Sequence, residues 1–361
     1  MNVLYIAPYR QADEWGVTSR GFLKILKNLN SEDQIKLVSR PIWFSGSIAD
    51  TKDLEEFEDI ESNSLESKDI LIQYGLPDHL VYRGDFKKNI AITSVDCEIE
   101  ETDWVVHLNL FDQVIVFSEH EKEILIKSGV KTEIFAFTFP PFYFGYLVEE
   151  KIDLKLNNKT KFYANAPLDD KSGFRETITA YLSSFNILDD VILVLFSNDS
   201  DEIKKEIDKA KFGLGMYADD SMYPNIAIVN ASSTEIMNWA HENLDCYIDV
   251  SYNGRVSQNV LKAISKDNLV IVLDTFSNII SKDYPLSVES YSDTCCYLSR
   301  PINFLYTGDS EWKKPLVKSL SASMRRASSE DLEVISQDLM ALKNKLFSLP
   351  YKKTKEALCL Q

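Results

Sequence analysis

The feature of this sequence that most restricts its fold is a repeated alternation of short apolar runs with amphipathic segments. The first apolar run, Asn2–Ala7, ends at Pro8, and a segment with apolar residues at helical spacing, 22–29, follows it. Runs of this length are typical of buried parallel strands, and an i, i+3, i+4, i+7 spacing is typical of helices that cover a sheet. Four further strands are predicted at residues 35–39, 70–73, 90–93 and 113–117. This order predicts an α/β sheet with right-handed crossovers.

The alternation restarts near residue 160, which predicts a second α/β domain. Five more strands are predicted at residues 161–164, 191–196, 226–229, 246–250 and 269–273. A long amphipathic helix is predicted from Leu332 onward. A chain of 361 residues is long enough for two hydrophobic cores. We therefore expect two Rossmann-like domains, 1–145 and 146–320, that face each other across a ligand cleft, followed by helices in 321–361.

Two local signals mark boundaries within this order. Ser118 and Glu121 form a capping-box pattern, which predicts a helix that starts there and stops at Gly129. The run FAFTFPPFYFGY, 135–146, holds a Pro pair that cannot continue a sheet ladder. We interpret it as a strand that runs into an interdomain linker, and an edge strand over an aromatic cluster is the alternative.

Composition excludes several classes of protein. The net charge of −17 disfavours a protein that coats nucleic acid or anionic lipid without specificity. The five cysteines are odd in number and none has CxxC spacing, which argues against a disulfide framework and a structural zinc site. No apolar stretch is long enough to span a membrane, and the N-terminus reads as a strand rather than a signal peptide. These features predict a cytoplasmic protein with no membrane span.

Ligands of open parallel sheets bind at the carboxyl ends of the strands, so the residues that follow each strand are the candidates for chemistry. Gly16, Val17 and Thr18 lie between the first strand and its helix, where a glycine lets backbone N–H groups approach a phosphate or sugar oxygen. An ordinary turn is the alternative. The chain has no GxGxxG sequence, which argues against a dinucleotide site.

Lys171 and the segment 251–257 follow two strands of the second half. A cation at a helix start has the wrong sign for the helix dipole, so Lys171 is a candidate for neutralising a diphosphate leaving group. Arg255 and Ser257 open a later helix and form a candidate anion cradle. A solvated surface is the alternative at both places. Asn198, Asn230 and Lys262 are further candidates, for contact with the nucleoside that such a diphosphate would carry.

Asp96 and His107 are the candidates of the first half. Asp96 follows a predicted strand, where a carboxylate accepts a sugar hydroxyl or a proton, and a helix cap is the alternative. His107 has apolar neighbours, so a core histidine is favoured over a catalytic one. No set of His, Cys and carboxylate residues has the spacing of metal ligands, so no metal is expected.

The order of these motifs resembles the GT-B glycosyltransferases, of the group 1 or family 4 type. Three segments carry the resemblance: NIAITSVDCEIEETDWVVHLNLFDQVIVFSEHEKEILIKSGV, KFYANAPLDDKSGFRETITAYLSSF and WAHENLDCYIDVSYNGRVSQNVLKAIS. The resemblance implies a retaining transfer of a sugar from a nucleotide-diphosphate donor, with Lys171 on the diphosphate, a UDP-sugar as the expected donor and no cofactor. It also implies that the helices in 321–361 cross back to the first domain. The chain departs from the family where two Glu are common, because Gly254 and Lys262 stand at those positions.

The acceptor is open at this stage. The Gly16-Val17-Thr18 sequence is also similar to phage DNA α-glucosyltransferases, which implies 5-hydroxymethylcytosine in DNA as an acceptor, whereas the net charge of −17 points away from DNA. A glycan or a small molecule is the alternative acceptor. The missing Glu pair also leaves open a GT-B-like binding or scaffold protein without transfer activity.

Overall fold

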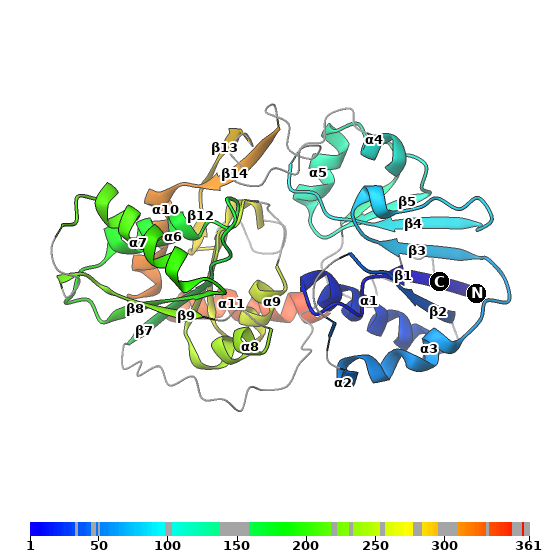
Figure 1. Cartoon of the computed structure of the whole chain (residues 1–361), viewed down its shortest axis with the longest axis horizontal. Helices are drawn as coiled ribbons and strands as arrows, with labels where there is room; N and C mark the ends of the chain where they lie inside the picture. Colours follow the sequence, from blue (N-terminus) through cyan, green and yellow to red (C-terminus); the bar gives the residue numbers. More distant parts are fainter. Residues whose placement is uncertain are drawn as a thin grey trace. The chain divides into compact units, whose positions relative to one another are not determined.

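The computed structural model of the chain describes residues 1–32, 35–44, 48–49, 51–97, 103–136, 159–217, 222–230, 234–252, 257–276, 284–294, 310–329, 332–348 and 356. The predicted linker at 137–146 lies outside the described residues. The chain divides into two compact units (Figure 1). Unit 1 comprises Met1–Gly145 with Lys345–Gln361, and unit 2 comprises Tyr146–Asn344.

Unit 1 contains a parallel six-stranded sheet in the order β2-β1-β3-β4-β5-β6. Its strands are β1 (Asn2–Ala7), β2 (Lys36–Pro41), β3 (Ile70–Tyr74), β4 (Lys88–Ile92), β5 (Gln113–Val116) and β6 (Ile134–Ala136). Its helical segments are α1 (Glu14–Ser31), α2 (Thr51–Leu54), η1 (Glu55–Phe57), α3 (Glu58–Ser62), η2 (Pro77–His79), α4 (Asp103–Leu108) and α5 (Glu119–Lys127). The predicted capping box is confirmed, since the Ser118 side chain accepts a hydrogen bond from the Glu121 N–H at 3.1 Å.

Unit 2 contains a second parallel six-stranded sheet, in the order β12-β11-β10-β7-β8-β9. Its strands are β7 (Thr160–Asn165), β8 (Val191–Ser197), β9 (Asn225–Asn230), β10 (Cys246–Asp249), β11 (Leu269–Leu273) and β12 (Ser287–Val288), and β13 (Ser290–Thr294) pairs with β14 (Glu311–Pro315) in an antiparallel hairpin. Its helical segments are α6 (Phe174–Ser184), α7 (Ser200–Gly213), α8 (Thr234–Asn243), α9 (Gln258–Ser265), η4 (Asp274–Phe276), α10 (Val317–Ala327) and α11 (Leu332–Ser348), of which the last ends in unit 1.

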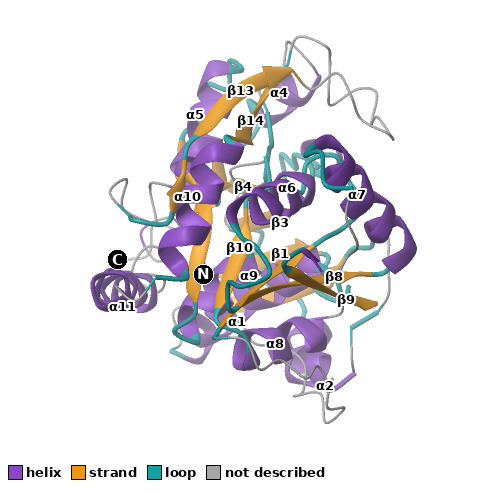
Figure 2. Ribbon diagram, turned by 90° about the vertical axis from the view of Figure 1, so that its left-hand side faces the viewer, coloured by secondary structure: helices purple, strands orange, loops and turns teal. Residues whose placement is uncertain are grey.

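The helices of unit 2 cover both faces of its sheet. α6 packs against α7 and α10 on one face, and α8 packs against α9 on the other (Figures 1 and 2). The side change follows from the strand order, because right-handed crossovers place helices on opposite faces when the chain reverses its direction across the sheet. The predicted α/β class is confirmed in both units. None of the described helices is both long and apolar enough to cross a membrane.

Candidate functional site

The strand order of unit 2 marks one place where a ligand is expected to bind. From β7 the chain adds β8 and β9 on one side, and then returns to add β10 and β11 on the other. The order in which the chain adds strands therefore reverses between β7 and β10, although the two strands are parallel. The carboxyl ends of two such strands leave a crevice that typically binds ligands. The loop that follows β7, 166–173, carries Lys171, and Ser257 follows β10 in the sequence; residues 253–256 lie outside the described part of the chain.

A glycine allows these two loops to touch. Gly173 has a φ of +72°, and a Cβ atom at this position would lie 2.4 Å from the carbonyl oxygen of Val250. A side chain is excluded by both the backbone conformation and this contact. Beside it, the N–H of Tyr252 donates to the carbonyl oxygen of Lys171 at 2.8 Å. The two loops are therefore joined through their main chains.

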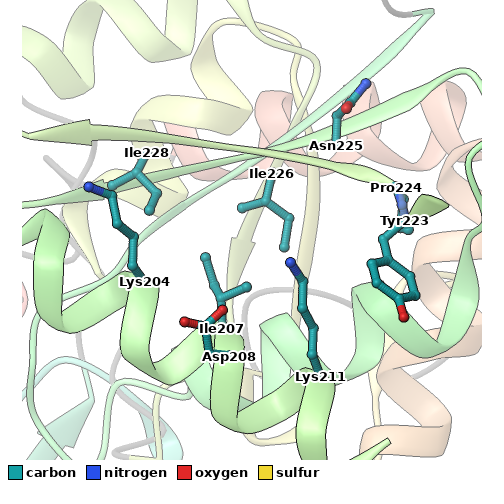
Figure 3. A pocket seen from close by; sticks show the side chains of 9 residues that line it. All are labelled: Lys204, Ile207, Asp208, Lys211, Tyr223, Pro224, Asn225, Ile226 and Ile228. Atoms are coloured by element: carbon teal, nitrogen blue, oxygen red, sulfur yellow. The ribbon is translucent and has the colours of Figure 1, made fainter. Parts of the chain in front are cut away.

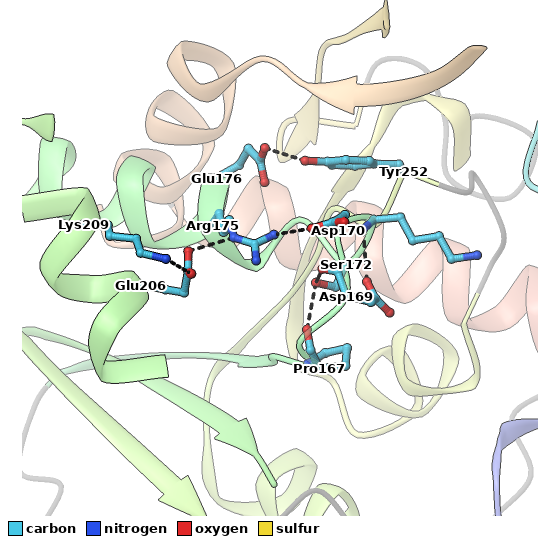
Figure 4. Close-up of polar contacts among 10 residues, drawn as sticks. Pro167, Asp169, Asp170, Ser172, Arg175, Glu176, Glu206, Lys209 and Tyr252 are labelled. Carbon is cyan, nitrogen blue, oxygen red and sulfur yellow. Dashed lines mark hydrogen bonds and ion pairs between the residues drawn. The ribbon is translucent and has the colours of Figure 1, made fainter. Parts of the chain in front are cut away.

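The loop that carries Lys171 is held by a chain of polar contacts (Figure 4). Arg175 on α6 donates to Asp170 at 3.1 Å and to Glu206 on α7 at 2.8 Å, and Glu206 also pairs with Lys209. The Lys171 N–H donates to the Asp169 carboxylate at 3.1 Å. These contacts order the main chain around Lys171.

The loop after β10 is organised by Asp249. Its carboxylate accepts from the hydroxyl of Ser251 at 2.7 Å and from the hydroxyl of Ser257 at 2.6 Å. The Ser257 oxygen also accepts from the N–H of Val260 at 3.2 Å, so Ser257 is the N-cap of α9. Because α9 follows β10, its amino terminus and the positive end of its dipole lie at the same sheet edge as Lys171. Arg255 and Gly254 lie outside the described residues.

The three candidates for nucleoside contact lie in different environments. Asn198 follows β8 and Asn230 ends β9, and both are exposed at the carboxyl edge of the sheet. With adjacent strands about 4.8 Å apart, the end of β9 is about 14 Å from the end of β10, so one ligand needs an extended shape to meet both. Lys262 is 2% exposed, and its Nζ lies 3.3 Å from the Asn238 side-chain oxygen. Nucleoside contact would need an exposed ammonium group, so the structure does not place Lys262 at the site with the others.

The structure accounts for Gly16 and Val17 in a different way from the prediction. Both lie inside the first turn of α1, where the Gly16 N–H donates to the Asp13 carboxylate at 2.9 Å and the Val17 N–H to the Asp13 carbonyl oxygen at 2.9 Å. The Gly16 N–H is therefore used in capping the helix, and the Val17 N–H makes its first main-chain hydrogen bond. Gly16 is needed because a Cβ atom there would lie 1.8 Å from the carbonyl oxygen of Gln11. The buried guanidinium of Arg20 also donates to that carbonyl oxygen and fixes the loop.

Asp96 and His107 lie on separate elements of unit 1. Asp96 is half-buried in the loop that follows β4. The same loop is anchored through Ser94, whose hydroxyl donates to the fully buried carboxylate of Glu121. His107 lies on α4, and its Nε2–H donates to the backbone oxygen of Leu80. His107 is half-buried, and a catalytic role for either residue stays a prediction.

A cluster of aromatic side chains, which the sequence pattern did not single out, lies at the carboxyl edge of the sheet in unit 1. The chain adds β2 on one side of β1 and β3 on the other, and the three rings follow these strands in the sequence. Trp15 lies in the first turn of α1, Phe44 in the segment after β2, and His79 in η2 after β3. The Phe44 and His79 rings stack with centroids 4.6 Å apart, and the Trp15 ring meets Phe44 edge-on at 5.9 Å. The Phe44 N–H donates to the buried Gln11 side chain at 2.7 Å. Only the strand order reveals that these three segments share an edge of the sheet.

A pocket of about 460 Å³ lies elsewhere on unit 2, between α7 and the edge strand β9 (Figure 3). Lys204 and Lys211 come from the helix, and Ile226 and Ile228 form the strand side. β9 is the edge strand and lies two strands from β7, so this pocket is separate from the β7–β10 crevice. Among the described residues, no group of three or more His, Cys, Asp or Glu is arranged to hold a metal ion.

Comparisons with known proteins agree on the fold. No protein-family model matches the sequence, and no curated protein matches it. The trehalose-6-phosphate structure from E. coli bound with UDP-2-fluoro glucose is similar at a TM-score of 0.63 and 11% identity, over 99% of this chain and 98% of that one. A UDP-forming trehalose-phosphate synthase from Burkholderia xenovorans matches at 0.61 and 11%, over 99% and 98%. Sucrose-phosphate synthase from Thermosynechococcus elongatus matches at 0.56 and 10%, over 99% and 100%. The predicted GT-B fold, built from two Rossmann-like domains, is thereby confirmed for this chain.

Proposed function

We propose that this chain is a glycosyltransferase that transfers a sugar from a nucleotide-diphosphate sugar to an acceptor hydroxyl. The observation that carries the proposal is the joined pair of loops at the β7–β10 crevice, which sets Lys171 and the amino terminus of α9 at one sheet edge. It is supported by a fold shared over 99% of the chain with a protein bound with UDP-2-fluoro glucose.

In the proposed reaction, the bond between the anomeric carbon and the donor diphosphate breaks, and a bond to the acceptor oxygen forms. Lys171, Arg255 and the first turn of α9 would hold the diphosphate and compensate the charge that develops on it, which makes a metal ion unnecessary. The acceptor hydroxyl loses its proton in the same step, and Asp96 is the proposed base or hydroxyl-binding group. Retention of the anomeric configuration is part of the proposal through the resemblance to family 4.

The acceptor is proposed to bind on unit 1, at the edge that holds Asp96 and the aromatic cluster. Stacked, partly exposed rings favour an acceptor that itself contains a ring. We propose to test 5-hydroxymethylcytosine in DNA, glycans and small hydroxylated molecules as the three acceptor classes.

The first experiment is the release of nucleotide from a panel of nucleotide sugars, with each acceptor class and without any. We expect release from at least one donor, and we expect Lys171→Ala to lower turnover at least tenfold. Lys204→Ala is the matched control, because Lys204 is an exposed lysine of the same unit that pairs with Asp201. Unchanged turnover in Lys171→Ala would remove this residue from the mechanism. No release from any donor would favour a binding or scaffold protein, the alternative that the missing Glu pair left open.

A further inference from the structure

Tyr252 connects the two loops of the β7–β10 crevice through both its main chain and its side chain. Its N–H donates to the carbonyl oxygen of Lys171 at 2.8 Å, and its hydroxyl donates to the carboxylate of Glu176 on the first turn of α6 (Figure 4). The residue is 4% exposed. One buried side chain is thus bonded to the element that begins directly after the loop of Lys171.

The hairpin β13–β14 covers the ring of Tyr252. Trp312 on β14 meets the ring edge-on, with centroids 5.4 Å apart, and the Lys314 ammonium lies 5.5 Å from the ring centroid. Such contacts fix the orientation of the ring and therefore of its hydroxyl. Burial, and then the adjacent Glu176 carboxylate, raise the pKa of Tyr252 well above its usual value, so the hydroxyl remains a hydrogen-bond donor at every working pH.

We propose that Tyr252 is a positioning residue that holds the Lys171 loop against the α9 loop before a nucleotide binds. The proposal rests on the proposed function of this site and adds to it a residue that touches neither substrate. A preformed site binds more tightly because less conformational entropy is lost on binding. The loss of the hydroxyl should therefore act mainly on the affinity for the donor and little on the chemical step.

The test compares two Tyr→Phe variants of the full chain. Tyr252→Phe removes the bond to Glu176, and Tyr181→Phe is the matched control. Tyr181 is also buried and lies on α6, the helix that carries Glu176. Its hydroxyl donates to the Asn225 carbonyl oxygen at 2.9 Å, at the amino end of β9. Each variant loses one partly buried hydrogen bond between a tyrosine hydroxyl and its partner, and both bonds involve α6 but lie at opposite edges of the sheet.

Three measurements are made on the chain and on both variants: the affinity for UDP by calorimetry, the KM and kcat for the donor, and hydrogen exchange of residues 166–172 without nucleotide. We expect Tyr252→Phe to weaken UDP binding and raise the donor KM at least fivefold, with kcat within a factor of two, and to speed exchange of this loop. Tyr181→Phe should change none of these, although its Tm falls by a similar amount.

Two results would overturn the proposal. One is UDP affinity in Tyr252→Phe equal to that of the unchanged chain. The other is an equal loss of affinity in Tyr181→Phe, which would assign the effect to stability alone. If the unchanged chain binds no nucleotide, the proposed function fails, but hydrogen exchange still decides the positioning role. Faster exchange of residues 166–172 in Tyr252→Phe alone supports that role. Equal exchange in the two variants refutes it.

Discussion

The replacement His241→Asn should change how the stability of the chain depends on pH. His241 is 1% exposed in unit 2, and its Nδ1 lies 2.7 Å from the Tyr163 hydroxyl. The Asn268 side chain donates to that hydroxyl oxygen at 2.7 Å, which leaves the Tyr163 proton for His241 Nδ1. Burial, followed by the nearby charge of Lys262, lowers the pKa of His241 to about 3.

The sign and size of the effect follow from linkage. The unfolded chain takes up a proton on His241 near pH 6.5, whereas the folded chain does not, so folding stability is lost as the pH falls below that value. With a folded pKa of about 3, the loss between pH 7.5 and pH 5.5 is about 1.4 kcal/mol. His241→Asn keeps an acceptor near the Tyr163 hydroxyl and does not titrate, so its stability should lack this part of the pH dependence.

The assay is urea unfolding of the chain and the variant at pH 7.5 and pH 5.5, both above the pI near 4.8. The difference in free energy of unfolding between the two proteins should change by about 1.4 kcal/mol between pH 7.5 and pH 5.5. The titration of every other group contributes equally to both proteins and therefore cancels. The chain has 4 histidines, so the NMR signal of His241 is identified by its loss in the variant. A His241 signal that titrates near pH 6.5, or a stability difference independent of pH, would refute the reasoning.

Three further predictions concern groups that the fold packs tightly. In thermal unfolding, Gly173→Ala should destabilise the chain by at least about 2 kcal/mol, because Gly173 has a positive φ and a Cβ there would clash with the backbone of Val250. Gly213→Ala is its control: open space surrounds Gly213, so this variant should be neutral or stabilising by up to about 1 kcal/mol. Gly16→Ala should lower the free energy of unfolding by at least about 2 kcal/mol in thermal unfolding, because a Cβ there would clash with the Gln11 carbonyl oxygen. A Tm equal to that of the unchanged chain would contradict this close contact. Glu121→Gln should lower the free energy of unfolding by about 2 kcal/mol, because the amide NH2 is a donor where the buried carboxylate only accepts hydrogen bonds. It should also speed hydrogen exchange of the loop after β4, and unchanged slow exchange there would argue that Glu121 does not anchor this loop.

Elements that depend on neighbours in the sequence were predictable from the sequence. The predicted strands agree with β1–β5 and β7–β11 to within about two residues at each end, because each is an apolar run whose period and length are local properties. The cap of α5 by Ser118 and the end of that helix near Gly129 were predictable for the same reason. Such signals need only three or four consecutive residues.

The hairpin β13–β14 was not predicted, because its strands, SYSDT and EWKKP, contain no apolar run. Its contribution to the site is the packing of Trp312 on Tyr252, a contact between residues 60 positions apart in the chain. Local periodicity carries no information about such a contact.

The sequence by itself determined which segments become strands and helices. It also identified Lys171 as a candidate site residue, because Lys171 follows a predicted strand. Tertiary structure alone decided which candidates share an edge and which are buried. Gly16 follows a strand as a ligand-binding glycine does, yet its N–H is used by Asp13 in a helix cap. Lys262 occupies a helix near the site, yet its ammonium group faces Asn238 in the interior. The physical reason is that burial and hydrogen-bond partners depend on strand order and on how helices pack, and both are set by contacts between segments distant in the chain.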